Sequence, residues 1–290
     1  MHHLSTPKVS VLIPIYKTNA KHLGEAIDSI LSQSFRDFEL LILNDSPDQT
    51  KLGDIVRAYQ DNRIKYHINE KNLGIAQSRN KLIDLAQGEY LAIMDHDDIS
   101  LPQRFEKQVA FLDSHPDVGV VGTYAESFPY KGHYPTRFEH DEEIKLALMT
   151  NCSIIHPSAM IRASILRNHQ IRYDEKFTPA EDYALWARLL PLTNFHNIPE
   201  ILFHYRWHVN STTKKQLSKM RQASMRIHDY LRENNPELYA KFHRKAHRVI
   251  RLRLFGCIPL FKIIRGESLG QVYLFDLIPI IKIKYNIKMY

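Results

Sequence analysis

The chain has 290 residues, of which 44% are hydrophobic and 24% are charged. This composition excludes a chain that is disordered throughout, and the length fits one large domain or one domain with an appendage. The two cysteines, Cys152 and Cys257, are too few and too far apart for a disulfide framework or a zinc site, so we expect a reducing compartment, the cytosol.

The net charge of +7 is unevenly distributed along the chain. Residues 214–290 contain 17 Lys and Arg against 5 Asp and Glu, whereas residues 1–213 contain 22 against 27. We therefore place a domain boundary near residue 213. No apolar run approaches the roughly 18 residues of a membrane-spanning helix, and the first residues lack the apolar centre of a signal peptide.

The first hundred residues predict alternating strands and helices. Apolar runs at residues 9–15, 38–43 and 90–94 indicate buried strands, with a shorter strand at 64–68. Between them, apolar residues recur at helix spacing around residues 23–31, 52–59 and 75–86. This alternation predicts a doubly wound, mainly parallel sheet that binds ligands beyond the carboxyl ends of its strands.

The regularity weakens after residue 115. We expect strands at 118–123, around 154–161 and at 201–208, with a helix at about 182–190. The domain thus divides into a half at about 8–115, which holds the polar loops at the strand ends, and a half at about 116–213, which we interpret as the acceptor side. Beyond residue 216 the pattern predicts a basic, mostly helical extension.

Three carboxylates, Asp95, Asp97 and Asp98, follow the last strand of the first half within four residues. Helix capping is one interpretation, but Ser100 and Gln103 form a capping box for the next helix and make the carboxylates unnecessary for that task. A solvated acidic turn is another. We favour a site for Mg²⁺ or Mn²⁺ bridging to substrate phosphates, because a hard cation relieves the repulsion between carboxylates.

Several motifs, in order, resemble one known family. They are VSVLIPIYKTNAKHLGEAIDSILSQSFRDFELLILNDSPDQT at residues 9–50, NLGIAQSRN at 72–80, YLAIMDHDDISLP at 90–102 and AEDYALWARL at 180–189. The sequence is similar to glycosyltransferase family 2 over about residues 8–213, and the ordered set is far more specific than any one motif. The resemblance implies a GT-A fold and an inverting transferase that uses a nucleotide sugar.

The resemblance also implies where the nucleotide binds. The loop Pro14, Ile15 and Tyr16, together with Asp45, would hold the base, and Arg79 would lie near the base and diphosphate. The residue types agree, since a carboxylate accepts from a base N–H and an Arg fork suits phosphate. As alternatives, Asp45 starts a turn and Arg79 is a solvated helix residue.

The carboxylate run contains a DXD pattern. By resemblance, Asp95 would hold the ribose and Asp97 would bind the metal ion, Mn²⁺ or Mg²⁺. His96 stands where the family often has a small residue, so it would border the sugar. His208 corresponds to a position where a histidine can reach the metal or diphosphate, although a structural or exposed histidine is the ordinary case.

The pair Glu181 and Asp182 is expected to serve the acceptor. Thr178 and Glu181 have the spacing of a capping box, which gives Glu181 a structural task but leaves Asp182 without one. In the family, the second residue of this pair is the general base. Glu181, His156 and Trp186 are weaker candidates for the acceptor site, and for the last two a packed core position is the alternative.

The basic extension interleaves Arg and Lys with apolar residues, as in Arg244–Phe255. We interpret it as interfacial helices on an anionic membrane surface, with a helical face packed on the catalytic domain as the alternative. Nucleic-acid binding is disfavoured because no known module for it is present. We expect a cytoplasmic enzyme at the inner face of the cytoplasmic membrane.

These observations predict transfer of a single hexosyl or N-acetylhexosaminyl group, most simply from a UDP-sugar, to a saccharide or lipid-linked glycan in lipopolysaccharide or capsule synthesis. Phe203 stands where processive members carry the Gln of Gln-x-x-Arg-Trp, which favours a single transfer. A glycoside hydrolase and a non-catalytic membrane scaffold remain alternatives. A dinucleotide enzyme is disfavoured, since residues 14–20 contain no glycine.

Overall fold

The computed structural model describes residues 6–129, 132–133, 138–207, 216–246, 248–254, 258–265, 269–274 and 278–284. The chain divides into two compact units, Met1–Tyr230 and Leu231–Tyr290. This division falls later than the boundary expected near residue 213. Within the first unit Ala223 and Ile227 are buried, and Arg226 donates to the carbonyl oxygen of Lys176 at 3.2 Å.

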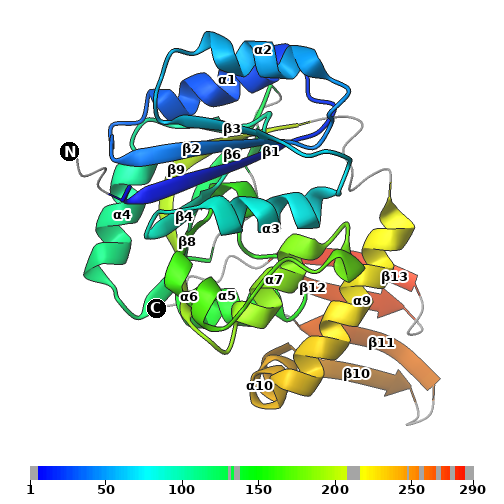
Figure 1. Ribbon diagram of the computed structural model, residues 1–290. Coiled ribbons are helices and arrows are strands. Elements are labelled where there is room, and N and C mark those ends of the chain that lie inside the picture. Colours follow the sequence, from blue (N-terminus) through cyan, green and yellow to red (C-terminus); the bar gives the residue numbers. More distant parts are fainter. Residues whose placement is uncertain are drawn as a thin grey trace. The chain divides into compact units, whose positions relative to one another are not determined.

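The first half of this unit is built as the sequence predicts. The elements are β1 (Val9–Ile15), α1 (Ala20–Leu31), β2 (Phe38–Asn44), α2 (Thr50–Ala58), β3 (Ile64–Ile68), α3 (Ile75–Leu85) and β4 (Tyr90–Ile93). The strands pair in parallel in the order β3-β2-β1-β4, with α1 and α2 on one face and α3 on the other (Figure 1). Every residue of β1, β2 and β4 is buried, because both faces of the sheet are covered.

The second half makes the sheet mixed. Its elements are β5 (Ile99–Ser100), α4 (Arg104–Ser114), β6 (Val118–Phe128), β7 (Gly132–His133), α5 (Asp141–Leu148), a 3-10 turn (His156–Ser158), β8 (Met160–Arg162), α6 (Ala163–Asn168), a 3-10 turn (Glu175–Phe177), α7 (Glu181–Leu189) and β9 (Asn194–Arg206). The strand β8 is antiparallel to both β4 and β6, whereas β6 and β9 are parallel. The parallel arrangement therefore holds for the first four strands and ends at β8.

Both predicted capping boxes are wrong. Ser100 lies in β5, and α4 begins at Arg104, where the Phe105 N–H donates to Gln33 Oε1 at 3.1 Å. Helix α7 begins at Glu181 without a side-chain cap. A glutamine from the end of α1, far away in the sequence, thus takes the place of the local cap in α4.

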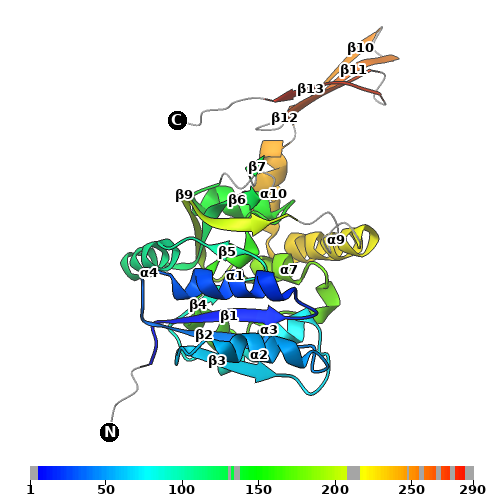
Figure 2. The same cartoon turned by 90° about the horizontal axis from the view of Figure 1, so that it is seen from above.

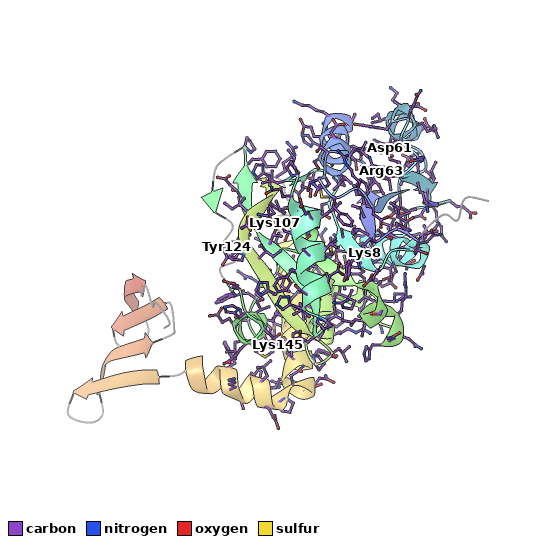
Figure 3. All side chains as sticks on the ribbon, turned by 90° about the vertical axis from the view of Figure 1, so that its left-hand side faces the viewer. Lys8, Asp61, Arg63, Lys107, Tyr124 and Lys145 are labelled. Atoms are coloured by element: carbon purple, nitrogen blue, oxygen red, sulfur yellow. The ribbon has the colours of Figure 1, made fainter. Side chains whose placement is uncertain are left out.

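The amino ends of the strands are closed by ion pairs. Lys8, which lies just before β1 and is labelled in Figure 3, pairs with Glu89 at 2.7 Å and with Asp113 at 2.8 Å. Tyr90 Oη donates to the same Asp113 carboxylate at 2.5 Å. The carboxyl ends of the strands are the opposite edge, and this is where polar loops gather.

The second unit corrects the prediction of a mostly helical extension. Helices α9 (Leu217–Asn234) and α10 (Pro236–Ala246) agree with it, α9 beginning in the first unit. Residues 248–284 instead contain the antiparallel strands β10 (Arg248–Leu254), β11 (Ile258–Arg265), β12 (Leu269–Leu274) and β13 (Ile278–Lys284) (Figure 2). The physical reason is the period-two alternation in RVIRLRL and IIKIK, which suits a strand.

The backbone register of this small sheet is set by the pairing of its strands. Ile250, Ile263, Val272 and Ile281 lie in one row across the four strands. Arg251 is paired with Lys262 in the adjacent row. In the part of the chain that the structure describes, no helix has both the length and the apolar character needed to cross a membrane.

Candidate active site

A cavity of about 590 Å³ lies at the carboxyl ends of β1, β2 and β4. This is the edge at which an open α/β sheet binds ligands. The residues that line it are Pro14, Ile15, Tyr16, Asp45, Asn72, Gly74, Ile75, Ser78, Arg79, Asp95, His96, Asp97, Asp98, Thr178, Pro179, Glu181, Tyr205, Arg206 and Gln216. All eight residues that the sequence assigned to the nucleotide sugar are among them.

The carboxylate turn at residues 95–98 is held by Arg206, which ends β9. The Arg206 N–H donates to Asp98 Oδ1 at 2.7 Å, and its Nε donates to the Asp97 carbonyl oxygen at 2.5 Å. The Arg206 guanidinium also pairs with Glu25 of α1 at 2.6 Å. In the sequence Arg206 is only part of an incomplete Gln-x-x-Arg-Trp pattern, and no local pattern indicates this role because its partners lie on distant elements.

Asp98 is the buried member of the turn, with 1% of its surface exposed. Burial, and then the neighbouring carboxylates of Asp97 and Asp95, raise the pKa of Asp98 well above its usual range. Its Oδ2 has no hydrogen-bond partner among the described residues. A buried, unsatisfied carboxylate oxygen beside two further carboxylates is an arrangement that a bound cation would stabilise.

The turn fits a divalent ion that is shared with a substrate. Among the residues that the structure describes, no group of three His, Cys, Asp or Glu side chains could hold a metal ion by itself. Mg²⁺ and similar divalent cations are commonly bound by one or two carboxylates together with substrate phosphates. Such binding does not require three protein ligands. Asp97 and His96 line the cavity, with His96 Nδ1 3.7 Å from Asp97 Oδ1. His208 lies outside the described residues.

Asp45 organises the loop that follows β3. Its Oδ1 accepts from Asn69 Nδ2 and the Leu73 N–H, both at 2.8 Å. Its Oδ2 accepts from Asn72 Nδ2 and the Gly74 N–H, both at 2.9 Å. Asp45 therefore lines the cavity with both carboxylate oxygens already engaged. The sequence marked the motif that contains Asn72 but did not predict these bonds.

Arg79 of α3 lines the cavity and connects the two halves. It is 7% exposed, and its Nη1 donates to Glu181 Oε1 at 2.8 Å while its Nη2 donates to Asp95 Oδ1 at 3.2 Å. Burial by itself opposes the charge, but Asp95, Tyr173, Glu181 and Asp182 raise the pKa of Arg79 above its usual value. Arg79 is thus a buried cation with two carboxylate partners and not a solvated helix residue.

Asp182 follows Glu181 in the first turn of α7 and is partly buried. Burial and the adjacent Glu181 raise the pKa of Asp182 to about 6, against the lowering effect of Arg79. A carboxyl group with such a pKa is suited to general base chemistry near neutral pH. Glu181 lines the cavity, whereas Asp182 is not among the described residues that do.

The two other acceptor candidates lie in the core. Trp186 is fully buried, and His156 is 5% exposed with its Nε2 2.7 Å from Tyr173 Oη. Neither is among the described residues that line the cavity. Burial, and then Arg79, lower the pKa of His156 well below its usual value, so this histidine is neutral. His156 packs against Trp186 of α7, with the two ring centres 5.7 Å apart.

Comparisons with known proteins agree with this geometry. A family model described as "Glycosyl transferase family 2" matches residues 10–170. An uncharacterised glycosyltransferase of Methanocaldococcus jannaschii is 35% identical over 210 residues, which cover 70% of this chain and 72% of the relative. The O-antigen biosynthesis glycosyltransferase WbnJ of Escherichia coli is 30% identical over 233 residues, which cover 78% of this chain and 89% of the relative.

Two solved structures share the fold. TarS residues 1–349 from S. aureus, in complex with UDP-GlcNAc, superimposes with a TM-score of 0.66 at 20% identity, over 81% of this chain and 71% of TarS. The mannosyltransferase PcManGT from Pyrobaculum calidifontis, in complex with GDP-Man and Mn²⁺, gives 0.57 at 16% identity, over 83% and 74%. The expected GT-A-type fold is therefore confirmed. Because the family model spans more than half of the chain, this protein belongs to glycosyltransferase family 2 and is a glycosyltransferase.

Proposed function

We propose that the enzyme is an inverting, metal-dependent transferase that moves a single sugar from a UDP-sugar to a glycan or glycolipid acceptor. The observation that carries the proposal is that the Asp95–Asp98 turn and Glu181 line one cavity, while Asp182, the next residue in α7, has a pKa of about 6. The turn suits a nucleotide diphosphate with its cation, and Asp182 suits a base. A role in lipopolysaccharide or capsule synthesis is supported by the name of the Escherichia coli relative.

The donor would occupy the cavity from the β1 and β2 loops to the carboxylate turn. Tyr16 is 47% exposed on the cavity wall, so its ring is available to stack on the base, while Asp45 keeps the facing loop in place. Asp95 would accept from the ribose hydroxyls, and His96 would border the sugar. Asp97, together with His208, would hold Mn²⁺ or Mg²⁺, which when bound neutralises charge on the diphosphate.

In the transfer itself, Asp182 removes the proton of the acceptor hydroxyl. The hydroxyl oxygen attacks the anomeric carbon from the face opposite the diphosphate. The bond from the anomeric carbon to the diphosphate oxygen breaks, and the configuration inverts. A positioned base contributes on the order of 10²- to 10⁴-fold to such a step. Glu181 lines the cavity next to Asp182 and would border the acceptor.

Calorimetry with UDP and Mn²⁺ tests donor binding directly. The wild type should bind, and Asp97→Ala should lose the metal-dependent part of that binding, while Asp54→Ala, an exposed aspartate of α2, should not. Unchanged binding in Asp97→Ala would remove Asp97 from the donor site. A glycoside hydrolase would not need UDP at all, so absence of binding in the wild type favours that alternative.

Transfer is tested by a panel of UDP-sugars with Mn²⁺. Asp182→Asn should keep UDP affinity while turnover falls by about 10²-fold or more. Retained turnover would mean that another group is the base. No turnover of any donor by the wild type would favour a non-catalytic membrane scaffold.

We also propose that the second unit holds the enzyme peripherally at an anionic membrane surface, on the cytoplasmic side. The support is the pairing of Arg251 with Lys262 on neighbouring strands and the excess of positive charge in residues 214–290. At about 1 kcal/mol for each basic residue near the surface, Arg251→Gln with Lys262→Gln should weaken binding to phosphatidylglycerol vesicles about 30-fold. Equal sedimentation of variant and wild type with the vesicles would contradict this proposal.

A further inference from the structure

Helix α3 is hydrogen-bonded to the segment that precedes α7. Asn80 exchanges two hydrogen bonds with the backbone of Tyr173, each 2.8 Å long. Gln77 Nε2 donates to Glu175 at 2.6 Å. These contacts join residues more than ninety positions apart. Helix α3 therefore fixes the position of the start of α7, where Asp182 lies.

Arg79 lies between Gln77 and Asn80 in α3, lines the cavity and contacts a carboxylate from each half of the unit. One guanidinium nitrogen bonds Asp95 in the carboxylate turn and another bonds Glu181 in α7, with the guanidinium 5.4 Å from the centre of the Tyr173 ring. Arg79 Nε and Glu181 Oε2 are buried and have no partner among the described residues. The side chain is therefore held by two carboxylates and an aromatic face.

We propose that Arg79 is a positioning residue. Through its contacts with Glu181 and Asp95 it fixes the position of the Asp182 carboxylate relative to the donor, and Arg79 is not a ligand of the donor diphosphate. This inference rests on the proposed function, in which Asp182 is the base. A phosphate that drew Arg79 away from Glu181 would leave a buried carboxylate without its partner, which is strongly unfavourable. Each terminal nitrogen already donates one N–H to a carboxylate, Nη1 to Glu181 and Nη2 to Asp95.

The charges around Asp182 give this role a measurable signature. Glu181 and Asp95 raise the pKa of Asp182, and Arg79 lowers it. The Cys152 thiol and the Tyr173 hydroxyl also interact electrostatically with Asp182. Since a base must be ionised to act, a variant that raises the pKa of Asp182 moves the acid limb of the pH–rate profile to higher pH.

The experiment compares Arg79→Met and Arg79→Lys with the wild type in UDP-sugar turnover and in UDP calorimetry. In Arg79→Met, kcat should fall about 10²-fold because the base is displaced, the acid limb should move up by about one pH unit, and UDP affinity should stay within about threefold. Arg79→Lys should restore part of both effects, because it keeps the charge but not the two-armed contact.

The matched control is Arg172→Met. Arg172 also ties the segment before α7 to α3, through an ion pair with Asp84 at 2.9 Å, but it does not line the cavity. Its kcat and pH profile should equal those of the wild type. If this control loses as much activity as Arg79→Met, the loss in both variants comes from weaker packing of α3. That result would overturn the inference.

Glu181→Gln supplies a second, independent variant if Arg79→Met fails to fold. Here kcat should also fall, but the acid limb should move to lower pH, because removal of the neighbouring negative charge lowers the pKa of Asp182. A limb that does not move, or one that moves up, overturns the inference.

The experiment also distinguishes failure of the inference from failure of the proposed function. If UDP affinity of Arg79→Met falls tenfold or more while kcat at saturating donor is unchanged, Arg79 is a donor ligand and the inference is wrong. If the wild type turns over no UDP-sugar, the proposed function fails, and the inference fails with it. An active wild type whose Arg79→Met acid limb is unmoved overturns the inference alone.

Discussion

Replacement of Asp45 by alanine should destabilise the protein through the loop after β3. The carboxylate is 3% exposed and accepts four hydrogen bonds, two from side-chain amides and two from the backbone N–H groups of Leu73 and Gly74. The amide of Asn69 keeps its bond to Ser78 Oγ at 3.3 Å, and that of Asn72 keeps its bond to the Asp45 carbonyl oxygen at 3.1 Å, but the backbone groups of Leu73 and Gly74 are fixed. At about 1.5 kcal/mol for each bond to a charged acceptor, the two backbone bonds give a loss of about 3 kcal/mol in the free energy of unfolding.

Urea denaturation followed by tryptophan fluorescence measures this loss. The matched control is Asp48→Ala, an exposed aspartate in the same loop as Asp45, which should change stability by less than about 0.5 kcal/mol. UDP binding should weaken in Asp45→Ala but not in Asp48→Ala. A loss of stability below about 1 kcal/mol in Asp45→Ala would refute the claim that its bonds order the loop, since it would equal that of one ordinary hydrogen bond.

The remaining predictions concern the core and the base. Trp186→Ala should lower the free energy of unfolding by about 3–5 kcal/mol in urea denaturation, because the side chain is fully buried. A loss below about 2 kcal/mol would show that the surrounding core closes the cavity. Gln33→Ala should cost about 1–3 kcal/mol by leaving the Phe105 N–H without its acceptor, and an unchanged denaturation midpoint would contradict this. Gly88→Ala should destabilise the protein, because a Cβ there would lie 2.6 Å from the Ser10 nitrogen; wild-type thermal stability would show that the backbone moves freely. Turnover should decline as the pH falls below about 6, since protonation removes the base Asp182, and a rate that is constant down to pH 5 would exclude it.

Local sequence patterns were sufficient for the first half of the fold. The apolar runs of β1 and β2 are continuous because both faces of the sheet are covered, and this signal is visible in a few neighbouring residues. The acidic residues after β4 could be assigned to the ligand edge for the same reason. Helix caps were harder to predict, because Gln33, which follows α1, caps α4 and no local pattern indicates that partner.

The extension shows where periodicity misleads. Basic residues interleaved with apolar ones suggested amphipathic helices throughout, yet β10 to β13 form a sheet in which Arg251 lies opposite Lys262. In short segments of mixed composition, the periods of helix and strand overlap, and pairing between strands decides the outcome.

The sequence by itself determined the family, the order of the first strands and helices, and the residue types at the ligand edge, because these depend on neighbours in the chain. The tertiary structure alone decided that Arg206 holds the carboxylate turn and that Arg79 joins Asp95 to Glu181. The Arg79–Glu181 and Arg206–Asp98 contacts each join residues more than a hundred positions apart. Such partners meet only when the two halves pack, so burial, hydrogen bonding and the pKa of Asp182 are properties of the fold and not of any segment.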